Sequence, residues 1–188
     1  METKPSYLGL LNAIAVGELG GEALLSAWGA TTTDPEVKAV VELVMWREAE
    51  HARSFAKRIN ELGFSVQDRP DPKLAGRIEI ASRRDLSDRE KLEQLGFAKE
   101  PAAGPDFFAR FFDDCTIDIH TGELLGRYIS EERDTGRRFR ACHAALCERD
   151  AAASRRPKPA TKKLATKPVA KPVAKPVAKR SKRSKPKK

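Results

Sequence analysis

The sequence predicts an all-α protein: a bundle of four principal helices with an irregular middle segment and a disordered C-terminal tail. Two features support this fold class. Apolar side chains recur at three- and four-residue spacing in long segments, as they do along the buried face of a helix. The end of the chain instead combines lysine with proline and has no acidic residue. We therefore divide the 188 residues into a helical bundle, residues 1–150, and a tail, residues 151–188.

The first helix is predicted at about residues 6–29. The positions that recur at three- and four-residue spacing form one stripe along the buried face of this helix. They are Leu11, Ile14, Ala15, Glu18, Glu22, Leu25 and Trp28. The apolar run at 8–17 within it is too short to span a bilayer, so we expect no transmembrane segment.

The second helix is predicted from Pro35 to about Leu62. Asp34 suits the N-cap, and Pro35 suits the first helical position, where no N–H is required. Gly63 is a C-terminal signal. The stripe of this helix is Val41, Val44, Met45, Glu48, His51, Ala52, Phe55 and Ile59. Because the loop before it is short, we expect the two helices to form an antiparallel hairpin.

The rest of the bundle is less regular. Residues 64–105 are rich in turn signals, and the capping box "SDRE" at 87–90 predicts a short helix to about Phe97. A third bundle helix is predicted from Asp106 through "FFARFFDDC", with its four phenylalanines in the core. The last helix is predicted from about Glu123 to Arg149. Its stripe is Leu125, Tyr128, Ile129, Glu132, Gly136, Phe139, Cys142 or His143, and Leu146.

Four polar side chains occupy stripe positions where the periodicity calls for apolar ones: Glu18, Glu48, His51 and Glu132. A buried ionised carboxylate costs several kcal/mol unless it is paired or coordinates a metal. Three such groups repel one another, so a shared cation would resolve the conflict. The hairpin puts Glu18 level with Glu48 and within reach of His51, and the Glu-x-x-His spacing puts both of its side chains on one helix face.

This pattern resembles the ferritin-like superfamily, in its rubrerythrin-like, carboxylate-bridged branches. That family has a glutamate on helix one, Glu-x-x-His on helix two and the same arrangement on helices three and four, around two irons or manganeses. Glu18, Glu48 and His51 match the first half. In the second half Glu132 matches the glutamate, but Thr135 stands where the histidine should be.

The predicted third helix also has no glutamate at the right level. The resemblance covers about residues 1–62 and, more loosely, 106–149. It implies a ferritin-like four-helix bundle that binds one or two ions of iron or manganese. Oxygen and nitrogen donors suit these metals better than copper or structural zinc.

Three states of the site remain open. The first is an incomplete two-metal site that is completed by water, Glu22 or Asp106. The second is a single ion held by the candidate ligands of the first two helices, with or without Glu132. The third is a metal-free relic, in which the carboxylates carry protons or pair with a neighbouring arginine: Arg47, Arg53 or Arg133.

The tail differs from the bundle in charge. It holds 15 of the 36 Lys and Arg residues and none of the 27 Asp and Glu, which leaves 21 basic residues against 27 acidic ones in the bundle. The repeat "KPVAKPVAKPVAK" places proline at every fourth position, which forbids a continuous helix and predicts disorder.

This composition resembles the basic tails of linker histones and of bacterial nucleoid proteins. Such an arm binds DNA or RNA phosphates without reading sequence. The predicted contacts are Lys162, Lys163, Lys167, Lys171, Lys175, Lys179, Arg180, Lys182, Arg183 and Lys185. Two other interpretations are a solubilising arm and an arm attracted to anionic lipid.

Three functional hypotheses follow from these features. The bundle is an iron-dependent oxidoreductase that reacts with oxygen or peroxide and is held near DNA by the tail. Alternatively, it is a metal-free structural or homo-oligomerisation module of a non-enzymatic nucleoid-associated DNA-binding protein. In the third hypothesis the bundle acts on a protein or small-molecule partner. An odd number of cysteines, three, without metal-like spacing favours a reducing cytoplasmic setting.

Overall fold

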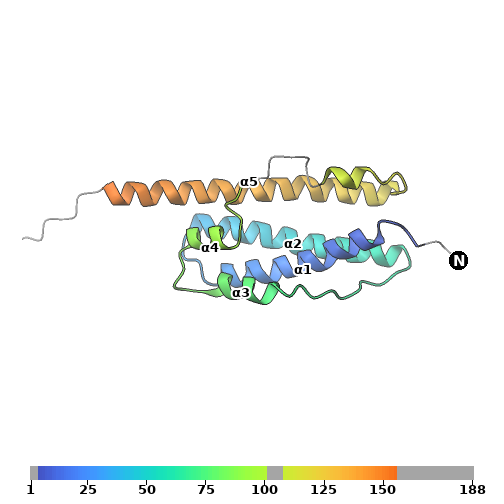
Figure 1. Cartoon of the computed structure of the whole chain (residues 1–188), viewed down its shortest axis with the longest axis horizontal. Helices are drawn as coiled ribbons and strands as arrows, with labels where there is room; N and C mark the ends of the chain where they lie inside the picture. Colours follow the sequence, from blue (N-terminus) through green and yellow to red (C-terminus); the bar gives the residue numbers. More distant parts are fainter. Residues whose placement is uncertain (1–3, 101–107, 156–188) are drawn as a thin grey trace, which may run out of the picture. The chain divides into compact units, whose positions relative to one another are not determined.

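The computed structural model describes residues 4–100 and 108–155, which are all-helical and contain no strand (Figure 1). The predicted all-α class is therefore confirmed. The three long helices are α1 (Leu8–Gly29), α2 (Pro35–Glu61) and α5 (Ile119–Arg155). Between α2 and α5 the chain forms the shorter elements α3 (Leu74–Ser82), α4 (Asp88–Gln94) and the 3-10 turn η1 (Ala109–Phe112).

The α1–α2 hairpin forms as predicted. The Asp34 carboxylate accepts hydrogen bonds from the backbone N–H groups of Glu36 and Val37, at 2.9 and 3.2 Å, and thereby caps α2. Pro35 opens the helix. Gly63 follows the end of α2 with a φ of 82°, a conformation that glycine adopts without strain.

The predicted third bundle helix is wrong. In its place the described residues form only η1 and a loop, while Asp106 lies outside them. The reason is local hydrogen bonding by aspartate. Asp114 accepts a bond from the Thr116 N–H at 2.9 Å, which closes a turn instead of continuing a helix. Of the four phenylalanines, Phe111 is buried and Phe108 packs beside it.

The last helix is longer than predicted at both ends. Asp118 accepts a hydrogen bond from the Thr121 N–H at 3.0 Å, so α5 begins at Ile119 rather than at Glu123. It continues to Arg155, past the predicted domain boundary at residue 150. The chain accordingly divides into the units Met1–Arg155 and Arg156–Lys188, the second of which lies outside the described residues.

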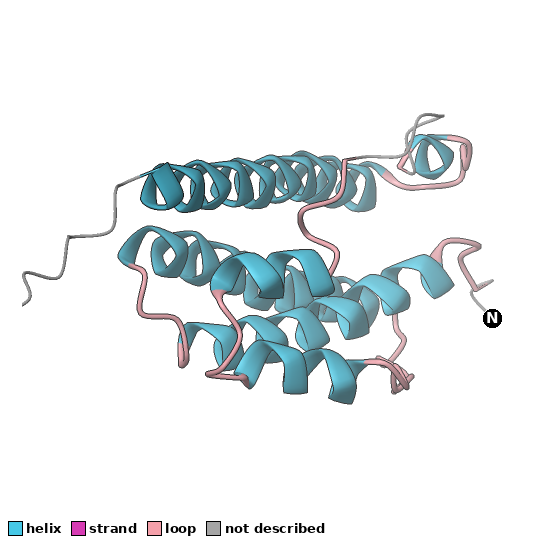
Figure 2. Cartoon of the chain, turned by 60° about the vertical axis from the view of Figure 1, so that its left-hand side comes forward, coloured by secondary structure: helices cyan, strands magenta, loops and turns pink. Residues whose placement is uncertain are grey.

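The middle segment is more regular than predicted. It contains α3, which the sequence pattern does not indicate, and α4, which begins at the predicted capping box. The Ser87 N–H donates to Glu90 Oε2 at 2.8 Å, and the Glu90 N–H donates to Ser87 Oγ at 3.3 Å. α3 packs on α1, and α4 packs on α5 and α3 (Figure 2). These two short helices, rather than a continuous fourth one, link α1 to α5.

The core is divided into two apolar clusters. The Tyr128 cluster includes Leu11, Ile14, Ala15, Phe55, Ile59, Leu125, Tyr128 and Ile129. The Trp28 cluster includes Leu24, Leu25, Trp28, Val37, Val41, Val44, Leu92 and Phe139. Each long helix contributes to both clusters, and in each helix the acidic stripe residues fall between the two contributions. We call this intervening level the polar layer; its members are Glu18 in α1, Glu48 and His51 in α2, and Glu132 in α5.

Helix α1 is also long and apolar enough to cross a membrane by length and composition. The mean hydropathy of its most apolar window is 1.4, and 44% of that window is buried inside the structure. The core helix of a bundle passes the same test, so the predicted absence of a transmembrane segment stays a prediction.

We predict that Phe139→Ala lowers the free energy of unfolding by about 3–5 kcal/mol, because it empties a large buried volume. Phe139 is 1% exposed and stacks on Trp28 and Phe97, with ring centroids 6.0 and 4.5 Å away. Urea denaturation measures the loss. The control is Ile119→Ala in the same helix, where the side chain is 86% exposed and the expected change is within about 0.5 kcal/mol.

Candidate metal centre

His51 lies at the centre of the polar layer, between carboxylates from two helices. It is 3% exposed. Its Nδ1 lies 3.0 Å from Glu18 Oε2, and its Nε2 lies 2.6 Å from Glu131 Oε2. The Tyr128 ring packs edge-on against the imidazole, with centroids 5.1 Å apart. Contacts on three sides therefore fix the orientation of the ring.

Glu18 and Glu132 complete the group around His51. Glu18 is 7% exposed, and its Oε1 accepts a hydrogen bond from the Tyr128 hydroxyl at 3.1 Å. Glu132 Oε1 lies 3.8 Å from His51 Nδ1. This oxygen is buried and, among the described residues, has no hydrogen-bond partner. One ligand atom each from Glu18, His51 and Glu132 lies within 4.8 Å of the other two, so this group could hold a metal ion.

Glu48, the fourth predicted ligand, lies beside this group. Its carboxyl group shares a hydrogen bond with that of Glu18 and extends past α1 at Gly21. A Cβ atom at Gly21 would stand 2.2 Å from Glu48 Oε2. The glycine is therefore what allows this carboxyl group to lie against the backbone of α1.

The other residues weighed for the site lie elsewhere. Glu22 is not part of the group that could hold a metal. Thr135, at the position of the missing histidine, is buried, and its hydroxyl lies 3.5 Å from the Arg47 guanidinium. Arg47 forms its ion pair with Asp134, at 2.8 Å, rather than with a carboxylate of the polar layer.

Two site residues were not predicted, Glu131 and Tyr128. The sequence pattern predicts Tyr128 only as a core residue of the α5 stripe, although its hydroxyl reaches Glu18. Glu131 lies beside the stripe, and Arg127 one turn earlier donates to its second oxygen at 3.1 Å. The pair of consecutive glutamates in "SEER" was the available signal, because neighbouring carboxylates on a helix can reach two sides of one histidine.

The electrostatics of the layer follow from burial. Burial, together with the charges of Glu18 and Glu132, raises the pKa of Glu48 to about 10. Burial and the charge of Glu18 likewise raise the pKa of Glu132 to about 7. Burial lowers the pKa of His51, but hydrogen bonds to Glu18 and Glu131 outweigh it and raise the pKa above its ordinary value. Without a metal, the layer is therefore neutralised by protons.

The pKa values of Glu131 and Tyr128 also depart from their ordinary values. Burial raises the pKa of Glu131, but hydrogen bonds from His51 and Arg127 outweigh it and leave the pKa below its ordinary value. Burial and the charge of Glu18 raise the pKa of Tyr128, which therefore stays a hydroxyl donor. Glu131 is thus the anion that faces the outer nitrogen of His51.

No protein-family model, curated protein or solved structure matches the chain. The resemblance to the ferritin-like superfamily accordingly stays a prediction, and so does the resemblance of the tail to linker histones. The ten predicted nucleic-acid contacts, Lys162 to Lys185, lie outside the described residues.

We predict that the metal-free protein loses stability as the pH rises. The folded pKa values of Glu48 and Glu132 lie above the ordinary value of 4.5, so the folded chain holds protons that the unfolded chain releases. Their contribution is complete below about pH 4.5 and is lost as the pH passes about 7 for Glu132 and about 10 for Glu48. Urea denaturation in excess chelator should show a falling free energy of unfolding between about pH 6 and pH 9.

Glu48→Gln should flatten this dependence, because a neutral amide replaces the acid. At high pH it should raise the free energy of unfolding by roughly 1–3 kcal/mol relative to the parent, because the folded variant no longer has to hold a proton that the unfolded chain releases. The matched control is Glu42→Gln on the same helix, where the side chain is 51% exposed. Equal slopes in Glu48→Gln and the parent would contradict the assignment.

Proposed function

We propose that this chain is a ferritin-like metal-binding protein that holds iron or manganese in the polar layer and is localised to nucleic acid by its basic tail. The observation that carries the proposal is the group formed by Glu18, His51 and Glu132, two buried residues and one half-buried residue from three different helices. Acidic groups at a surface are common without a metal, whereas a convergent buried set incurs a desolvation cost that a cation offsets.

The unpartnered oxygen of Glu132 supports this proposal. It is buried, and it lies near the same His51 nitrogen that faces Glu18. A buried acceptor without a donor costs about 1–3 kcal/mol. A cation between Glu132, Glu18 and His51 Nδ1 would serve all three ligands at once and would replace the proton that otherwise links His51 to Glu18.

The contact at Nε2 of His51 also supports a role for this residue as a metal ligand. A histidine that binds metal through one nitrogen usually donates its other N–H to a carboxylate, which fixes its tautomer and orientation. Glu131 accepts from Nε2 at 2.6 Å and is itself held by Arg127. Glu131 would thus orient the ligand without contacting the metal, and Tyr128 would hold the second oxygen of Glu18.

The donor set indicates the type of ion. Carboxylate oxygens with one imidazole nitrogen suit iron or manganese. Three ligand residues within reach of one point favour a single ion, and a second ion would require Glu48. Bound iron would supply redox chemistry toward oxygen or peroxide. Glu18, Glu132 and His51 would bind it, while burial in the layer would limit the release of radicals near the nucleic acid.

A metal-free module is the second candidate function, and the hydrogen bonds of His51 favour it. Both ring nitrogens already face carboxylates, and the pKa of Glu48, raised to about 10, keeps that acid neutral. In this alternative the layer is satisfied by protons, and the protein is a non-enzymatic nucleoid-associated protein whose function resides in the tail.

We predict that Mn²⁺ raises the melting temperature of the chelator-treated protein, because a ligand that binds only the folded state stabilises it. At 100 times its dissociation constant the gain is about 2.7 kcal/mol. His51→Ala should abolish the shift. His120→Ala is the matched control, because His120 is exposed and should leave the shift intact. An equal shift in His51→Ala and the parent would exclude the site.

A separate prediction concerns DNA binding by the tail. Retardation of duplex DNA should weaken steeply with salt, by roughly 10³–10⁵ between 50 and 200 mM if about 6–10 phosphates are neutralised. Deletion of residues 156–188, which keeps α5 complete, should abolish retardation. Retardation by the shortened chain equal to that of the full chain would show that the tail is not the binding element.

A further inference from the structure

A cavity of about 640 Å³ opens beside the polar layer, between α1, α3 and the segment that joins α2 to α3. The α1 wall combines small residues, among them Ala13, Gly17 and Gly20, with valine and leucine side chains. Leu74 of α3 and the rings of Phe97 and Phe139 complete a mainly apolar lining. The volume lies within the range of about 300–1,000 Å³ that is typical of small-molecule sites.

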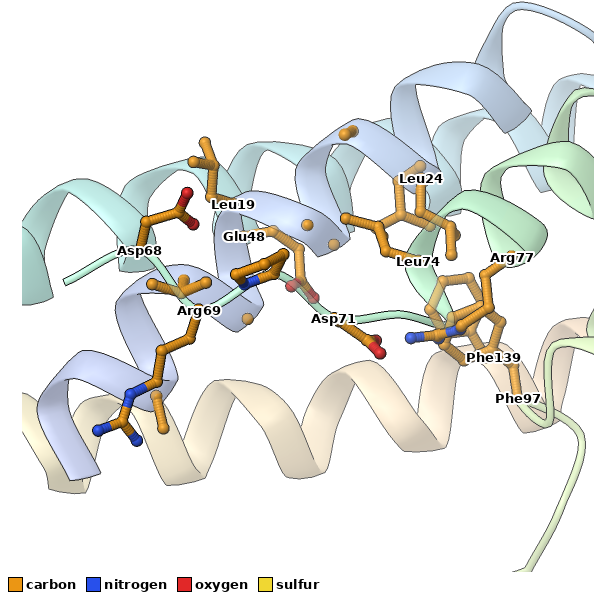
Figure 3. Close-up of a pocket in the computed structure, with 18 residues that line it drawn as sticks. Leu19, Leu24, Glu48, Asp68, Arg69, Asp71, Leu74, Arg77, Phe97 and Phe139 are labelled. Atoms are coloured by element: carbon orange, nitrogen blue, oxygen red, sulfur yellow. The ribbon is translucent and has the colours of Figure 1, made fainter. Parts of the chain in front are cut away.

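Glu48 connects this cavity to the candidate metal centre. Figure 3 shows its carboxyl group among the residues that line the cavity, beside Asp71. The same side chain shares a hydrogen bond with Glu18, which in turn contacts His51. The absence of a Cβ atom at Gly21 makes the passage of Glu48 across α1 possible. The cavity is thus separated from the centre by the side chain of Glu48.

The charges around the cavity restrict what it can hold. Asp68 and Asp71 are balanced by Arg69 and Arg77, so the surrounding charged residues favour neither a cationic nor an anionic ligand. An apolar body would pack against Leu74 and the two phenylalanine rings. Glu48 offers one polar contact at the inner end, where a hydroxyl group can hydrogen-bond to a carboxyl oxygen.

We propose that this cavity binds a small, electrically neutral alcohol or phenol, with its apolar part against Leu74 and Phe97 and its hydroxyl on Glu48. A role for this ligand as the substrate of the metal centre rests on the proposed function, whereas the binding itself does not. The two are therefore tested separately, and binding is measured in metal-free protein.

The test uses tryptophan fluorescence. Trp28 stacks on Phe97 and Phe139, which line the cavity, with ring centroids 6.2 and 6.0 Å away. In a Trp46→Phe background Trp28 is the only tryptophan, because the chain contains two. The protein is titrated in excess chelator with 1-octanol, octanoate or octylammonium, three probes with the same chain and different head-group charge.

We expect 1-octanol to give a saturable change, with a dissociation constant on the order of 0.1–1 mM for a ligand of this size. Octanoate and octylammonium should bind at least about tenfold more weakly, because a charged head group loses its hydration on entering the cavity and the balanced charges of Asp71 and Arg77 give no net compensation. Glu48→Met, which removes the acceptor but keeps the volume, should weaken 1-octanol binding by roughly three- to tenfold.

Gly17→Leu tests the location of the site. A Cβ atom at Gly17 meets nothing within 4 Å, so a side chain there starts into open space, and leucine also favours the helix. Gly9→Leu is the matched control, since Gly9 lies in α1 away from the cavity and has equally open space. Binding lost in Gly17→Leu and kept in Gly9→Leu supports the proposal. Equal binding in both, or tighter binding of a charged probe, overturns it.

Discussion

The burial of several carboxylates at one level of the bundle is the constraint on which the rest of this structure depends. Glu18, Glu48 and Glu132 face one another between two apolar clusters, where their charges are poorly solvated. Like charges in such a place must be neutralised by protons, by His51 or by a cation. The same residues therefore decide stability and its dependence on pH, and they would decide the affinity for a metal ion under the proposed function.

Protons and a metal ion would compete for these groups, and this competition would link the two candidate functions. A metal ligand must be deprotonated, whereas the metal-free layer is stabilised by protonation of Glu48 and Glu132. Raising the pH should therefore weaken the metal-free fold and strengthen metal binding. The metal-free module and the metal protein are then two states of one arrangement of side chains.

The candidate ligands could be predicted because helical periodicity is a strong signal in long helices. Glu18, His51 and Glu132 lie where a stripe calls for apolar residues, and the structure brings these three together. Glu48 also lies at a stripe position, but helical periodicity alone does not show which of the neighbouring carboxylates of the polar layer contact His51. Glu131 could not be assigned in this way, because it contacts His51 from beside the stripe.

The fold was less predictable where segments are short. The phenylalanine-rich segment before α5 reads as an apolar helix, yet the side chains of Asp114 and Asp118 bond to nearby backbone and give a turn and a helix cap. α3 is only nine residues long and contains a glycine, so the segment is too short for a helical pattern of apolar residues to be recognised. Packing on α1 stabilises it, and packing cannot be read from local sequence.

The most direct test of the central claim is elemental analysis of full-length protein purified from cells supplied with iron and manganese, beside Glu18→Gln and Glu132→Gln variants. The account predicts one to two equivalents of metal per chain in the parent and a large loss in both variants, with the fold retained by circular dichroism. A folded parent protein without metal, or variants that retain the parent's metal content, would contradict it.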